Sequence, residues 1–125
     1  MRSLRFLVVL VLALELAVWE SFLVAARPFG LALPLSAVLA LVGNVAVGTA
    51  GARVLERPLG AAVPGLVWLG TALMLGSTGP GGDSVVTGSW RGIAFLVAGA
   101  AGAAGVVGLT GAGKNRATPE AELRR

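Results

Sequence analysis

The stretch FLVVLVLALELAVWESFLVAA, residues 6–26, decides the fold of this chain. Apart from two glutamates and one serine it is apolar on every side of a helix. Its length matches the roughly 20 residues needed to cross the hydrocarbon core of a bilayer. A helix of a water-soluble domain keeps a polar face, and this segment has none. The segment therefore predicts a membrane-spanning helix.

Three further apolar stretches follow, at about 31–52, 59–75 and 92–110. The chain of 125 residues is 56% hydrophobic and 13% charged, whereas soluble domains carry about a quarter charged residues. We therefore expect an all-α fold, a four-transmembrane-helix bundle over residues 1–110. Residues 111–125 are polar and mixed in charge, so we expect a flexible cytoplasmic tail there.

The basic residues lie mostly on one side of these stretches. Eight of the ten flank the ends of the first and fourth stretches or separate the second from the third; they are Arg2, Arg5, Arg53, Arg57, Lys114, Arg116, Arg124 and Arg125. The other connections hold only Arg27 and Arg91. Because positive residues stay in the cytoplasm, we expect antiparallel up-down helices with both termini cytoplasmic, in a multi-pass protein of the cell membrane. The Gly/Pro-rich segment 76–89 is predicted to be an irregular outer loop.

Composition also excludes several classes of function. The chain has no Cys and no His, which removes thiolate nucleophiles, the usual neutral-pH proton shuttle and the commonest metal ligands. We expect no enzyme, no cofactor and no metal site. The net charge is +4, and the basic residues that give rise to it flank the apolar segments and do not form a continuous stripe. It therefore favours a lipid bilayer as partner and not nucleic acid.

Ionisable side chains inside a membrane are costly and often functional. Glu15 lies near the middle of the first stretch, and Glu20 lies five positions further, about 140° around a helix. The two carboxyl groups therefore do not share a face. We expect Glu15 to meet Asn44 at similar depth, and Glu20 to lie near Arg91, whose long stem can reach inward. Such pairs either fix the register of the helices or form a proton or substrate site.

Small residues recur at helical spacing in two stretches. They are Ser36, Ala40, Asn44, Gly48 and Ala52 in the second, and Gly99, Gly102, Gly105 and Gly108 in the fourth. Small residues let helix backbones approach closely in a membrane, within one chain or between two. Trp68 lies deeper than the other tryptophans, and we expect it to fill the core or to line a small cavity.

Two resemblances follow from these residues. The run Pro64-Gly65-Leu66-Val67-Trp68, the Gly-Pro-Gly-Gly-Asp loop and the Gly/Ala-rich last stretch resemble uncharacterised small four-span membrane proteins of high-GC Gram-positive bacteria, which implies location and topology only. Glu15 and Trp68 also resemble the essential first-span Glu and the third-span Trp of small multidrug resistance exporters. That resemblance implies proton-coupled efflux of lipophilic cations by a dimer. The chain departs from those exporters in having no Tyr and an extra first-span Glu20.

Two hypotheses of different class follow. The leading one is a structural or accessory integral membrane protein without catalytic activity, which docks onto another membrane protein or a second copy of itself. The alternative is a small proton-coupled transporter or exporter that uses Glu15. Flux that depends on Glu15 would distinguish the transporter from the accessory protein.

Overall fold

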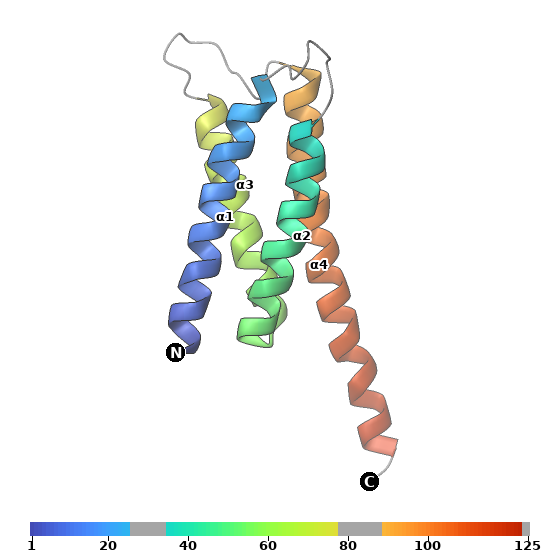
Figure 1. Cartoon of the computed structure of the whole chain (residues 1–125). Helices are drawn as coiled ribbons and strands as arrows, with labels where there is room; N and C mark the ends of the chain where they lie inside the picture. The colour runs from blue at the N-terminus through green and yellow to red at the C-terminus, as the bar shows by residue number, and fades with distance from the viewer. Residues whose placement is uncertain (26–34, 78–88, 124–125) are drawn as a thin grey trace.

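The computed structural model describes residues 1–25, 35–77 and 89–123, with side chains in 1–24, 35–77 and 89–113. The described residues form four α-helices and no strand (Figure 1): α1 (Arg2–Ala25), α2 (Leu35–Leu55), α3 (Pro58–Ser77) and α4 (Trp90–Leu123). The predicted all-α class with four helices is confirmed. The turn around Arg27 and most of the predicted outer loop lie outside the described residues.

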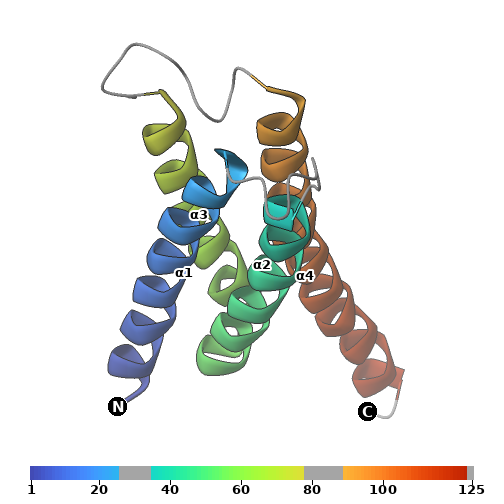
Figure 2. The ribbon, with the colours of Figure 1, turned by 45° about the horizontal axis from the view of Figure 1, so that its top comes forward.

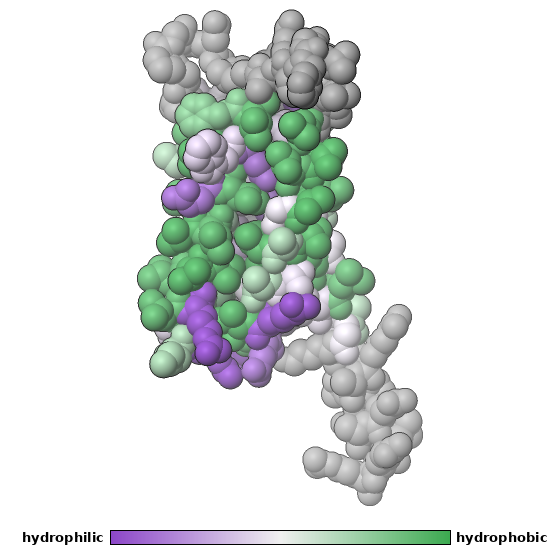
Figure 3. All heavy atoms as spheres, in the orientation of Figure 1, coloured by the Kyte–Doolittle hydropathy of each residue, from purple (hydrophilic) through white to green (hydrophobic). Residues whose placement is uncertain are grey.

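Each helix is long and apolar enough to cross a membrane, over 20 to 24 residues. On the face seen in Figure 3, apolar colour covers most of the described surface, and most of the hydrophilic colour gathers at its lower end. Large apolar side chains point outward on every helix, including Phe22, Met74 and Leu109. A surface this apolar is far beyond what a soluble monomer exposes. The structure is therefore that of a multi-pass membrane protein.

Local chemistry ends one helix and starts the next. The backbone N–H of Glu56 donates to the carbonyl of Ala52 at 2.7 Å, and Glu56 has φ 55°, which closes α2 with a left-handed cap. Pro58 then occupies the first position of α3, where its missing N–H costs nothing. At the start of α4, the N–H of Gly92 donates to Ser89 Oγ at 3.2 Å, an N-cap. The start of α1, the α2–α3 turn and the end of α4 lie at the same end of the molecule (Figure 1).

The inner helices are α2 and α3. Each of them contacts all three other helices, whereas α1 and α4 hardly touch and stand on opposite sides of the bundle (Figure 2). The largest buried side chains are Trp68 of α3 and Phe95 of α4, whose ring centroids are 5.1 Å apart at 58°. Three alanines and one valine complete this cluster: Ala17, Val24, Ala40 and Ala72. Two large rings set among alanines give the core its shape.

Small residues allow the closest backbone contacts. A Cβ on Gly51 would collide with the carbonyl oxygen of Gly60, where α2 meets α3 near their turn. A Cβ on Gly102 would lie 2.7 Å from the carbonyl oxygen of Leu41. In α2 the first four small residues of the predicted face are buried; they are Ser36, Ala40, Asn44 and Gly48. These contacts hold α2 against α3 and α4.

The structure differs from the sequence prediction in α4. Gly99 and Gly102 are buried, but a Cβ on Gly105 or Gly108 would meet nothing within 4 Å among the described residues. The lower half of the predicted glycine face therefore does not pack against the described residues, because a spacing of three residues turns each successive glycine by about 60° around the helix. At the same depth, it is Val106 that faces Gly48 of α2. The helical backbone also reaches Leu123, whereas we expected the span to end near Thr110 and a flexible tail to follow. Ala, Glu, Leu, Lys and Arg favour the helix there, and extending a formed helix is easy.

Candidate functional site

A buried carboxyl group lies between α1 and α3. The indole Nε1–H of Trp68 donates to Glu20 Oε2 at 2.8 Å. Glu20 is 3% exposed and Trp68 is fully buried. Burying a carboxyl group costs several kcal/mol unless hydrogen bonds replace its water. The indole supplies such a bond from a different helix, so the pair ties α1 to α3.

The other two helices shape the surroundings of this pair. On α2, Gly43 lies against Glu20 and Leu16. A Cβ at this position would lie 2.9 Å from Glu20 Oε1 and would collide with the Leu16 side chain. On α4, Gly99 faces the edge of the Trp68 indole so closely that a Cβ would collide with it, and Phe95 packs against the same ring. Two glycines and one aromatic ring therefore leave a space shaped for a carboxyl group bound to an indole.

Two more polar atoms are buried in the bundle. Asn44 Nδ2 donates to the carbonyl of Ala40 in its own helix at 3.0 Å. Asn44 Oδ1 and Ser21 Oγ are buried without a hydrogen-bond partner among the described residues. Ser21 follows Glu20 directly in α1, and Asn44 follows Gly43 in α2. An unpaired buried acceptor or hydroxyl destabilises a protein by about 1–3 kcal/mol, so a water molecule or a ligand group at either atom would be stabilising.

The predicted pairing of Glu15 with Asn44 is wrong. Glu15 is exposed on the outer side of α1, beside Trp19 and Leu12 and close to Val47 of α2. Asn44 is buried and bonded within its own helix. The two glutamates do point in different directions, as their five-residue spacing requires. It is Glu20 that enters the core.

The predicted approach of Arg91 to Glu20 is also not observed. Within the described part of the chain, Glu20 bonds only to Trp68, and Arg91 at the start of α4 is half-buried with no ion pair. The helices α1 and α4 make few contacts, and none of the described contacts joins Glu20 to Arg91. Of the five candidate residues, the structure brings together only Glu20 and Trp68.

Sequence reasoning missed this pair because it assigned each acidic group a charged or amide partner. Tryptophan was treated as core filling, although its indole N–H usually finds an acceptor when it is buried. That rule was the available signal, since Trp68 was already expected in the core. Among the described residues no three acidic side chains gather closely enough to hold a metal ion.

No protein-family model, curated protein or solved structure matches this chain. The site must therefore be interpreted from its own geometry. It is a narrow, helix-bridging polar contact, and it is separate from the outward-facing Glu15.

Proposed function

We propose that the protein is an accessory component of the cell membrane, with antiparallel helices and both termini in the cytoplasm. The charge asymmetry of the sequence supports this orientation, because the basic residues of the α2–α3 turn and of the start of α1 belong to the side that carries eight of the ten basic residues. The start of α1 and the end of α4 lie at the same end of the molecule in Figure 1, as this orientation requires.

The accessory role rests on one observation, the exposure of Glu15. Six residues at spacings of four and three form an outward stripe on α1, the α1 seam: Leu4, Val8, Val11, Glu15, Trp19 and Phe22. The other five are large and apolar, as lipid contact requires. Glu15 has no hydrogen bond or ion pair within the described residues. A carboxyl group that faces lipid costs about 2–3 kcal/mol at the centre of a helix.

A partner helix would recover this cost. The spacing of the α1 seam is that of a helix–helix contact. A groove of about 650 Å³ runs beside Glu15, between α1 and Val47 of α2. A membrane helix that carries a basic or hydrogen-bonding side chain at the depth of Glu15 would satisfy the carboxyl group and fill the groove. The protein then acts by binding and stabilising another membrane protein, with no chemical step of its own.

Photo-crosslinking in intact membranes tests this proposal. A photoreactive side chain at Val8, in the α1 seam, should give an adduct heavier than the 12.5 kDa chain. The same group at Leu66, which is even more exposed on α3, should give none. Glu15→Leu should abolish the adduct and Glu15→Gln should retain part of it. An adduct of twice the chain's mass would identify the partner as a second copy of this chain. The absence of any adduct at Val8 would refute docking.

A second candidate function is proton-coupled transport, with Glu20 in place of Glu15. The observation that favours it is the burial of the Glu20 carboxyl group in a bundle that holds two further buried oxygens without a partner among the described residues, Ser21 Oγ and Asn44 Oδ1. A buried carboxyl group can exchange a proton if water enters from one side. In sealed vesicles, this function predicts flux that is lost in Glu20→Gln and kept in Glu15→Gln. Equal flux in both variants would refute it.

A further inference from the structure

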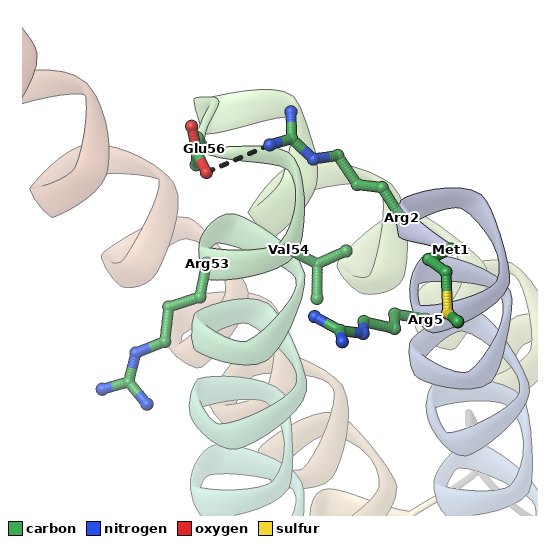
Figure 4. Close-up of a pocket in the computed structure, with 6 residues that line it drawn as sticks. All are labelled: Met1, Arg2, Arg5, Arg53, Val54 and Glu56. Carbon is green, nitrogen blue, oxygen red and sulfur yellow. Dashed lines mark hydrogen bonds and ion pairs between the residues drawn. The ribbon is translucent and has the colours of Figure 1, made fainter.

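A pocket of about 460 Å³ opens at the end of the bundle where α1 begins and α2 ends. Six residues line it: Met1, Arg2, Arg5, Arg53, Val54 and Glu56. Figure 4 shows Arg2 extending from α1 toward Glu56, and Arg5 extending from α1 toward Val54 of α2. The pocket is therefore lined both by guanidinium groups and by the apolar side chains of Met1 and Val54.

The pocket carries excess positive charge. Its three arginines face one carboxylate, and the only ion pair among its residues joins Arg2 and Glu56 at 3.3 Å. Both of these side chains are largely exposed, at 65% and 71%, so their pairing contributes little and exchanges easily. Arg5 and Arg53 have no acidic partner among the described residues. The site can accept an anion at Arg5 without breaking any existing contact.

The position of the pocket selects the kind of anion. Arg5 lies at the edge of the apolar surface of α1, where Val8 and Leu12, three and seven positions further along the same helix face, are exposed. A ligand bound here meets guanidinium groups at one end and an apolar helix surface at the other. Guanidinium groups recognise phosphate through paired hydrogen bonds, and basic pockets between membrane helices on the cytoplasmic side bind anionic headgroups.

We propose that this pocket, the arginine pocket, binds the phosphate group of an anionic membrane lipid. Arg5 holds the phosphate, and Arg2 leaves Glu56 to join it. Arg53 lines the pocket with its guanidinium directed away from Arg5 (Figure 4), and it adds attraction at longer range. The acyl chains extend along the apolar surface of α1 that follows Arg5. This site does not depend on the accessory or transport function of the protein.

The experiment uses the full chain in a neutral detergent, with lipid adducts counted by native mass spectrometry. Phosphatidylglycerol should bind at least fivefold more tightly than phosphatidylcholine. Arg5→Gln and Arg2→Gln should each weaken phosphatidylglycerol binding by about fivefold or more, because a charge-assisted contact is lost. Glu56→Gln should strengthen binding by about twofold to fivefold, since it removes the only negative charge of the pocket.

Arg57→Gln is the matched control. It removes the same charge from the same end of the molecule, but Arg57 does not line the pocket. It should change the affinity by less than about twofold. An equal loss in Arg57→Gln and Arg5→Gln would show diffuse attraction to a basic surface and would overturn the site. Equal binding of the two lipids would also overturn it, as would complete competition by millimolar inorganic phosphate, which would identify a soluble anion as the ligand.

Discussion

Trp68→Phe tests the contact that joins α1 to α3. The substitution keeps an aromatic ring against Phe95 and removes the N–H that donates to Glu20 at 2.8 Å. Loss of the donor leaves a buried acceptor unpaired, which costs about 1–3 kcal/mol. The smaller ring leaves a void of about 40 Å³, which costs about 1 kcal/mol more. We therefore expect the free energy of unfolding to fall by about 2–4 kcal/mol.

A double-mutant cycle separates these two contributions. In a Glu20→Leu background no carboxyl group remains to be satisfied, so Trp68→Phe should cost only the void. The coupling energy between the two positions should therefore be about 1–3 kcal/mol, a range that includes the upper end of interhelical hydrogen bonds in membranes. The assay is unfolding in mixed micelles of increasing SDS content, followed by far-UV circular dichroism so that the loss of a tryptophan does not change the signal.

The control cycle uses the same residue types on the outside of α1. Trp19 and Glu15 are both exposed, and Trp19→Phe with Glu15→Leu should show a coupling energy below about 0.5 kcal/mol. If the Glu20–Trp68 coupling is no larger than this control, then the indole–carboxyl bond does not stabilise the bundle and the reasoning is refuted.

Further substitutions test the packing, the outer surface and the turn. Gly51→Ala should lower the unfolding temperature in detergent by several degrees, because its Cβ would collide with the Gly60 carbonyl. Gly105→Ala is the control, since its Cβ meets nothing within 4 Å in the described chain. It should be neutral or should stabilise the protein by up to about 1 kcal/mol. Equal effects of the two would contradict the close approach of α2 and α3. Glu15→Leu should increase the stability of the isolated chain by about 1–3 kcal/mol in SDS unfolding, and a loss of stability would show that Glu15 has a partner within the bundle. Glu56→Gly should add about 1 kcal/mol in the same assay, because glycine removes the strain of a positive φ while the exposed pair with Arg2 contributes little; a loss above 1 kcal/mol would assign that stability to the ion pair.

The number of helices and their approximate positions were predictable because hydropathy and length alone determine them. The four apolar stretches of the sequence correspond to α1–α4. The buried face of α2 was also predictable, since the small residues around Asn44 recur every four positions and only close packing makes that spacing useful.

For the other three helices, the side that faces the core was not predictable. A helix that is apolar all round gives no signal of which side turns inward, so Glu15 and Glu20 were equally good candidates for the core. Only the packing of Trp68 against Gly99, with Gly43 beside the carboxyl group, selects Glu20. The same lack of signal explains why the predicted glycine face of α4 was extended to Gly105, which lies on the outward side of the helix although the adjacent Val106 packs against α2.

We propose that lipid surrounds the four helices and that both ends of the chain face one compartment. Because the chain has no native cysteine, single cysteines at Ser3, Ser84 and Thr118 can be labelled in intact cells with a reagent that does not cross membranes. We predict labelling at position 84 from outside, and labelling at positions 3 and 118 only after the membrane is opened. Labelling of positions 3 and 118 from opposite sides, or recovery of the chain in the soluble fraction without detergent, would contradict the account.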